Sequence, residues 1–154
     1  MRLKFAVAFC GSIASVMSGA VAYADSGGIV IEGAWSRASV GTMRPGVAYM
    51  SISNDGDEPV VLTGLRSGIA KMPQIHMTST NAEGISSMAP AGEIEIAPGE
   101  AVALEPGGLH VMLMSLNSAL REGESHTLTL LFSDGDPVTV EVPILGIGAR
   151  GPKD

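Results

Sequence analysis

The feature of this sequence that most constrains its fold is a series of short extended segments separated by turns. In VAYMSISN (47–54), for example, two sets of side chains alternate, as in a strand with one buried face. Turns rich in Gly, Pro and Asp, such as NDGDEP and APGE, separate the segments. This spacing predicts an all-β sandwich or barrel. The extended segments are 29–31, 34–37, 47–54, 60–67, 74–78, 94–96, 101–108, 109–116, 125–132 and 138–145.

One helical candidate interrupts these strands, at 116–121 in SLNSALREGE, where a single turn is expected to link two strands. The chain has no internal repeat and no low-complexity run, so we expect a single domain. We place the domain at 25–147, between an N-terminal segment (1–24) and a polar, loose C-terminal tail (148–154).

The N-terminal segment has the pattern of a secretory signal peptide. Arg2 and Lys4 form a basic start, and an apolar run follows from Phe5 to Val16. The residues before Asp25 read Ala-Tyr-Ala, which matches a small-x-small cleavage site. The run is too short and too broken by Gly and Ser to span a bilayer comfortably; a retained anchor is the alternative. We therefore expect a periplasmic mature chain that starts at Asp25 and has no membrane span.

Cysteine and charge exclude several functions. Cys10 is the only cysteine and lies in the signal segment, so the mature chain has no thiol nucleophile, redox CxxC or Cys-ligated blue-copper centre. The formal net charge is −7 and becomes more negative when Arg2 and Lys4 are removed. This argues against binding to nucleic acid, whose phosphates need a basic surface. The simplest role of the acidic surface is solubility.

Histidine and methionine concentrate in one stretch, from Lys71 to Met114. In its last part, GGLHVMLM, His110 and Met112 alternate with aliphatic residues, so on a strand they share one face. An imidazole nitrogen beside a thioether sulfur makes half of a soft metal site, because methionine sulfur favours Cu(I). The other residues of the stretch with such donors are Met72, His76, Met77, Met88 and Met114.

Four residues form the candidate ligand set: His76, Met88, His110 and Met112. Two imidazoles and two thioethers are uncharged, which suits a soft, monovalent, roughly tetrahedral ion such as Cu(I). Zn²⁺ more commonly recruits thiolate or carboxylate. Taken singly, each methionine is more often a filler of core gaps, and a lone histidine beside aliphatic residues is more often structural. The combination favours metal binding.

The spacing of these residues resembles a known family. His76-Met77, ten residues, Met88, twenty-one residues and His110-Val111-Met112 match the HM-x10-M-x21-HxM signature of PCu(A)C-type periplasmic copper chaperones. AWSRAS, GVAYMSISN and LEPGGLHVMLM also resemble that family. The resemblance implies a cupredoxin-like, Greek-key β-sandwich that binds one Cu(I) per chain through His76, Met88, His110 and Met112.

The resemblance also implies partners. Such proteins deliver copper toward the copper centres of cytochrome c oxidase, alongside Sco-type proteins, and we expect a monomeric, non-enzymatic carrier here. The chain ends at Asp154 without a His/Met-rich extension, so we expect one copper site and no second Cu(II) site of the kind that some members have. The alternative within this class is a copper buffer without a dedicated oxidase target.

Other functions have less support. An electron-transfer cupredoxin lacks its cysteine, an enzyme lacks a recognisable catalytic motif such as HExxH, and a metal-free adhesion sandwich would leave the signature unexplained. Met77, on a strand, points away from His76, which favours packing over ligation. For Met43 and Met72 core or loop packing is the default, and a role around the site or in metal transfer is the alternative. Met114 shares the face of His110 and is expected at the rim or in the core, and His126 is expected to be structural. Trp35 and Arg37 are interpreted as supporting the fold.

Overall fold

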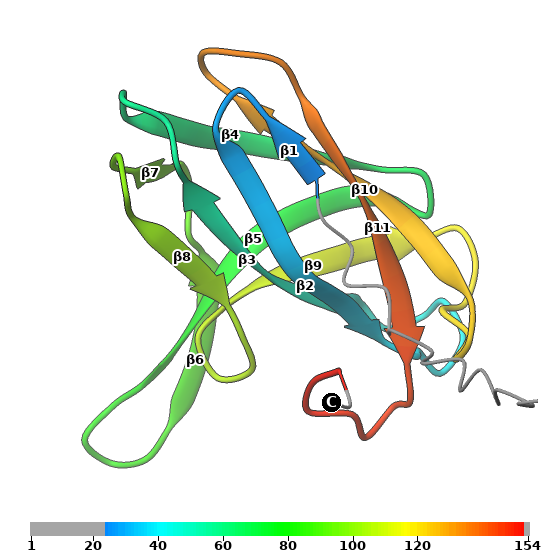
Figure 1. Ribbon diagram of the computed structural model, residues 1–154. Helices are drawn as coiled ribbons and strands as arrows, with labels where there is room; N and C mark the ends of the chain where they lie inside the picture. The colour runs from blue at the N-terminus through cyan, green and yellow to red at the C-terminus, as the bar shows by residue number, and fades with distance from the viewer. Residues whose placement is uncertain (1–23, 153–154) are drawn as a thin grey trace, which may run out of the picture.

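The computed structural model describes residues 24–152, which form eleven strands (Figure 1). The predicted signal peptide, 1–24, lies outside these residues except for Ala24. No helix in the described part of the chain could cross a membrane. The strands are β1 (Ala24–Ser26), β2 (Ile29–Arg37), β3 (Gly46–Asn54), β4 (Val60–Ser67), β5 (Ala70–Thr80), β6 (Ser86–Pro90), β7 (Ile94–Ile96), β8 (Ala101–Leu104), β9 (Leu109–Leu116), β10 (Ser125–Phe132) and β11 (Val138–Leu145).

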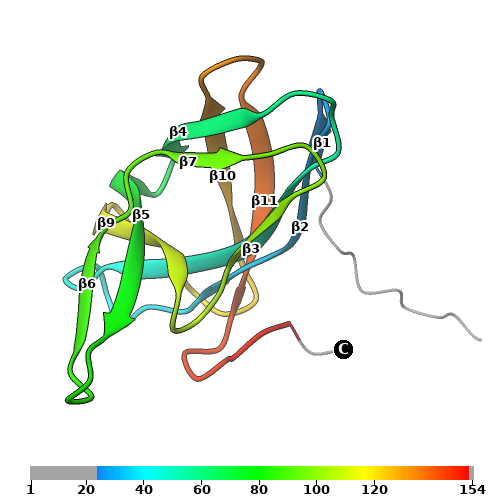
Figure 2. The same ribbon diagram turned by 90° about the vertical axis from the view of Figure 1, so that its left-hand side faces the viewer.

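The strands are hydrogen-bonded in the order β6-β5-β9-β3-β2-β11-β10-β4-β7, with β1 beside β2 and β8 beside β3. All pairings are antiparallel except β2 with β11, where Ser36–Arg37 lies beside Ile144–Leu145. This short parallel pairing joins one layer (β6, β5, β9, β3, β2) to the other (β11, β10, β4, β7), and the chain curls so that the two layers face each other (Figure 2). The predicted all-β sandwich is confirmed.

The core fills the space between the layers. Ile31, Ile52 and Leu113 from one layer and Leu128 and Val142 from the other are completely buried. Their positions alternate with more exposed residues along each strand, as the sequence predicted. Burial of one such side chain stabilises the fold by roughly 1.5–3 kcal/mol.

Two predicted strands, 29–31 and 34–37, are joined into the single strand β2. The register with β3 shifts between Glu32 and Trp35, and Gly33 between them has φ +61°. Glycine adopts this left-handed conformation without a steric penalty, so the strand carries a bulge instead of ending.

The helical turn predicted at 116–121 is wrong. The first residue of that segment belongs to β9, and the residues that follow form no helix. Their backbone groups bond to other segments instead: Asn117 N–H donates to the Ile69 carbonyl, and Leu120 N–H donates to Ser39 Oγ. Leu120 is buried in the core, so tertiary packing outweighs the weak local helical preference.

His126 is buried in the sandwich and packs as a structural residue. Its Nε2 lies 3.1 Å from Ser36 Oγ, and its Nδ1 has no partner. Burial lowers the pKa of His126, while the backbone of Thr127 acts in the opposite direction with smaller effect. The unfolded chain therefore binds a proton more readily than the folded one. The stability that this residue contributes is complete above about pH 6.5 and is lost as the pH falls toward the lower folded pKa.

We predict that stability falls on acidification partly because of His126. Between pH 7.5 and 5, the free energy of unfolding should decrease by up to about 1.4 kcal/mol per pH unit from this group, the one-proton limit. Urea unfolding of the parent and of a Ser36→Ala/His126→Leu double variant measures it. The double variant should show a shallower pH slope, whatever its stability at pH 7.5. Equal slopes would contradict the assignment.

Candidate metal centre

His76 and His110 lie directly opposite each other on the antiparallel strands β5 and β9. Opposed residues in such a pair project to the same face of the sheet. Their ring centroids are 6.2 Å apart, and the ring planes are inclined by 41°. The next residue along, Ile75, faces the core with Val111 opposite it. The histidine pair therefore occupies the outer face, and the same two strands supply the core with their other face.

Met88 and Met112 are both diagonal neighbours of His76 on this outer face. Met88, on β6, is opposite Thr78 of β5. Met112, on β9, is opposite Gln74 of β5. Thr78 and Gln74 are each two residues from His76, so all these side chains project to one side. Diagonal neighbours on a sheet are within reach of long side chains. The register thus places the other three predicted ligands, His110, Met88 and Met112, next to His76.

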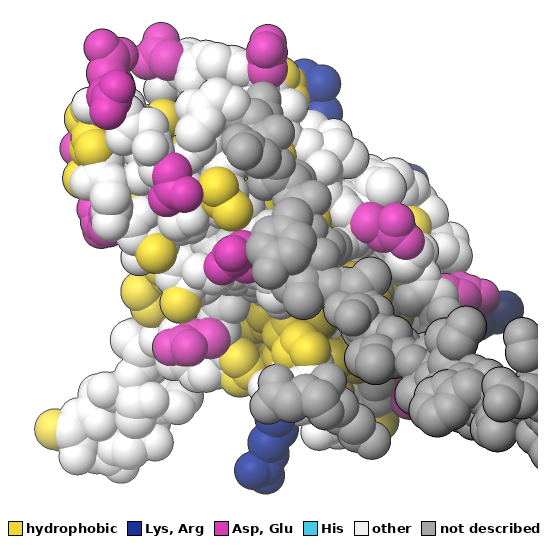
Figure 3. Space-filling view, viewed as in Figure 1, with side chains coloured by type: hydrophobic (Ala, Val, Ile, Leu, Met, Phe, Trp, Pro, Cys, Tyr) yellow, Lys and Arg dark blue, Asp and Glu magenta, His cyan; other side chains and the backbone are white. Residues whose placement is uncertain are grey.

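The four side chains differ in burial. His110 is 4% exposed, His76 and Met112 are partly buried, and Met88 is 60% exposed. Met88 is on β6, which with β5 forms a hairpin that extends away from the sandwich (Figure 1). In the face shown in Figure 3, this hairpin is mostly neutral polar surface, whereas acidic side chains are spread over the body. The site is therefore closed at His110 and open at Met88.

The contacts of the His110 ring favour one tautomer. Its Nδ1 lies 3.1 Å from the Gly108 carbonyl, and because a carbonyl can only accept, Nδ1 carries the hydrogen. The same carbonyl accepts from Thr78 N–H at 3.2 Å, which ties it to β5. The remaining nitrogen, Nε2, is buried without any partner. A buried acceptor without a partner costs free energy, and a neutral imidazole with Nδ1–H bonded to a carbonyl is the usual form of a metal-ligating histidine.

Gln74 and the Gly108 carbonyl were not among the residues singled out from the sequence. Gln74 Oε1 lies 3.4 Å from His76 Nε2, a long contact that another partner of this nitrogen can readily displace. Strand alternation could have identified Gln74 as a neighbour of His76, because residues two apart on a strand share one face. No sequence signal identifies the Gly108 carbonyl, because its role depends on the conformation of the turn before β9.

Trp35 and Arg37 form a stack with Tyr49. Trp35 is opposite Tyr49, and the ring centroids are 4.6 Å apart. The Arg37 guanidinium carbon lies 5.8 Å from the Trp35 centroid and 5.5 Å from that of Tyr49, which is cation–π range. Burial raises the pKa of Tyr49, and the Arg37 charge partly opposes this. By strand alternation Tyr49 shares a face with Val47, which is opposite Met112, so the stack continues the outer face of the site.

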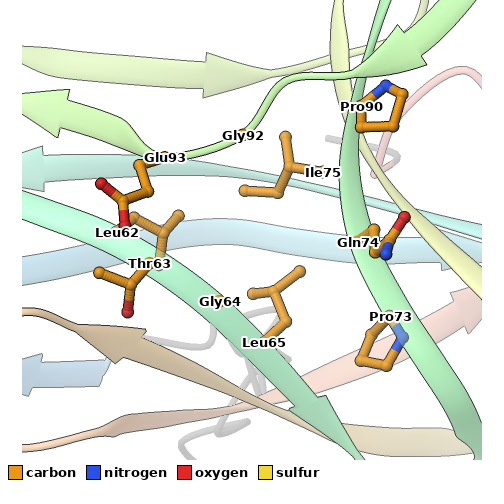
Figure 4. Close-up of a pocket in the computed structure, with 10 residues that line it drawn as sticks. All are labelled: Leu62, Thr63, Gly64, Leu65, Pro73, Gln74, Ile75, Pro90, Gly92 and Glu93. Atoms are coloured by element: carbon orange, nitrogen blue, oxygen red, sulfur yellow. The ribbon is translucent and has the colours of Figure 1, made fainter.

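A cavity of about 240 Å³ lies between β4 and β5, on the reverse side from the histidines. Figure 4 shows Ile75 directed into it toward Leu62, whereas the Gln74 amide is turned to the other side of β5. Within residues 24–152 there is no group of three or more His, Cys, Asp or Glu side chains placed to hold a metal ion. By register, the thioethers of Met88 and Met112 are diagonal to His76 in this histidine pair.

Comparison with known families and proteins agrees with this geometry. The family model described as "Putative lipoprotein LpqE-like" matches residues 29–144. A relative from Leifsonia xyli subsp. xyli (strain CTCB07), named "Putative lipoprotein Lxx21020", is 34% identical over 118 residues, which cover 76% of this chain and 69% of that protein.

Solved structures show the same fold. The copper-bound PCuAC domain from PmoF2 has a TM-score of 0.68 at 27% identity, over 80% of this chain and 97% of that one. The apo PCuAC domain from PmoF2 has a TM-score of 0.69 at 25% identity, over 84% and 99%. The solution structure of CuI-DR1885 from Deinococcus radiodurans is 34% identical with a TM-score of 0.55, over 73% and 75%.

These similarities confirm the cupredoxin-like β-sandwich that the sequence predicted. The chain belongs to the LpqE-like family, and the predicted relationship to PCu(A)C-type copper chaperones is confirmed. This is a family of copper chaperone domains and not a known enzyme family.

We predict that metal-free His110 is the Nδ1–H tautomer. Nitrogen NMR of uniformly ¹⁵N-labelled protein at pH 8, through two-bond couplings to the ring protons, distinguishes a protonated Nδ1 from a protonated Nε2. The Gly108 carbonyl should hold the proton on Nδ1 and leave Nε2 as a free acceptor. A protonated Nε2 would show that the ring is not prepared for a ligand at that atom.

Proposed function

We propose that this protein is a copper carrier that binds one Cu(I) through His76, Met88, His110 and Met112 and releases it to another protein. The observation that carries the proposal is the buried, unpartnered Nε2 of His110, a residue opposite His76, which in turn has Met88 and Met112 as diagonal neighbours. A metal ion bound there would satisfy this nitrogen. The copper-bound relatives support copper as the cargo.

The donor set favours the reduced ion. Two imidazoles and two thioethers carry no charge and are soft, which suits Cu(I) better than Zn²⁺ or Cu(II). The burial gradient suits a carrier, because the exposed Met88 can leave the metal while His110 still holds it. An incoming protein ligand can then replace the donors one at a time.

We place the carrier in the periplasm, where the predicted signal peptide (1–24) would deliver it. The domain then covers 25–147, and a tail covers 148–154. The Ala149 carbonyl in this tail accepts a hydrogen bond of 2.7 Å from Arg37 Nε. The lipoprotein-like relative is compatible with export.

The acceptors we propose are the copper-site subunit of cytochrome c oxidase and a Sco-type protein. A monomeric copper buffer is the second candidate.

We predict that Met88→Leu and Met112→Leu each lower Cu(I) affinity by at least about tenfold. Loss of a group that only orients a ligand already lowers metal affinity by about this factor, and loss of the ligand itself should cost no less. Leucine keeps most of the volume and deletes the sulfur, so each change should cost less than about 1.5 kcal/mol of stability. Anaerobic titration against a Cu(I) chelator measures the affinity.

Met77→Leu is the matched control. Met77 is opposite Leu109 and Ala89, so it projects to the reverse face of the same hairpin, and it is 42% exposed. This variant should bind Cu(I) like the parent. Parent-like binding by both Met88→Leu and Met112→Leu would refute the ligand assignment.

We predict that cells lacking this protein lose cytochrome c oxidase activity at low copper and regain it when copper is added. The full-length chain should restore activity at low copper, because it is exported and delivers the ion. A chain without residues 1–24, and an exported Met88→Leu/Met112→Leu chain, should not restore it. Unchanged oxidase activity in the deletion strain, with altered copper tolerance, would favour the buffer instead.

A further inference from the structure

We propose a second Cu(I) position, formed by the thioethers of Met72 and Met114 and continuous with Met112. This thioether pair lies outside the ligand set described above. The inference rests on the proposed function, because it concerns the route by which copper reaches or leaves the histidine pair.

The register brings the two sulfurs to one place. Met72 on β5 is directly opposite Met114 on β9, so their side chains project to the same face. Met112 is two residues from Met114 and His76 is four from Met72, which puts all of them on the outer face. Cβ atoms of directly opposed residues lie about 4.5–5.5 Å apart, a distance that two flexible methionine side chains can close around one ion.

Neither methionine of this pair belongs to the buried core. Met72 is 50% exposed and Met114 is only partly buried. Met50, by contrast, is 3% exposed and fills the core, as methionine commonly does. The core-facing residues of the same strands are aliphatic, such as Val111 and Leu113, both fully buried. The outer face of β5 and β9 therefore carries thioethers where solubility alone favours polar residues.

The chemistry of this pair differs from that of the histidine site. Two or three thioethers and no imidazole make a soft, uncharged site that selects Cu(I) and binds it more weakly than a site with nitrogen donors. Met112 adjoins both positions, because it is diagonal to His76 and two residues from Met114. A Cu(I) ion held by Met72, Met114 and Met112 can pass to His76 and His110 by exchanging one ligand at a time. No redox change or proton transfer is needed.

Methyl NMR of the full chain labelled with [methyl-¹³C]methionine tests this directly. Cu(I) is added anaerobically as its acetonitrile complex, first one equivalent and then a second. The first equivalent should shift the methyl signals of Met88 and Met112. The second should shift those of Met72 and Met114 and leave Met77 in place. Static Met72 and Met114 signals through two equivalents would overturn the proposal.

A Met72→Leu/Met114→Leu variant isolates the second position. It should bind the first Cu(I) like the parent and lose at least about tenfold in affinity for the second, because it lacks both sulfurs. Met77→Leu should keep both affinities. Equal second affinities in parent and double variant would also overturn the proposal. If the methyl signals of Met88 and Met112 do not shift at either equivalent of Cu(I), the proposed function fails. The second position is then still tested separately by the methyl signals of Met72 and Met114.

Discussion

The site depends on the register between β5 and β9. His76 opposite His110 fixes which residues share the outer face, and the same pairing puts Ile75 opposite Val111 in the core. A slip of one residue in either strand would turn its donors inward and expose its aliphatic side chains. The hydrophobic core therefore keeps the donors on the outer face, because a register displaced by an odd number of residues would expose the aliphatic set.

One consequence is that the two faces of these strands tolerate change differently. Removing a core-facing aliphatic residue such as Leu113 would leave a cavity, which costs about 2–5 kcal/mol for truncation to alanine. Exchanging an exposed methionine such as Met88 disturbs little packing. An exposed donor such as Met88 can therefore be altered while the sandwich stays folded, so that loss of metal binding can be separated from loss of structure.

The sequence predicted those features that depend on local alternation. The strands, the sandwich, and the shared face of His110 and Met112 all follow from a period of two. The placement of Met88 required more, because β6 was not recognised as a strand and its alignment with β5 is a tertiary property. The Gly108 carbonyl and the Trp35–Tyr49 contact could not be predicted either, because turn conformation and a bulge determine them.

Under the proposed function, the burial gradient across the site would give copper exchange a direction. His110 is fixed by its bond to the Gly108 carbonyl and is almost fully buried, so an ion bound at its Nε2 is shielded from water and from other proteins. Met88 is on β6, whose residues are all exposed, so its side chain can be displaced without disturbing the core. A partner that approaches from the hairpin side would meet the exposed thioether first and the buried imidazole last. In the proposed carrier, buried and exposed donors on one sheet face would allow the ion to be retained in the absence of a partner and released stepwise in its presence.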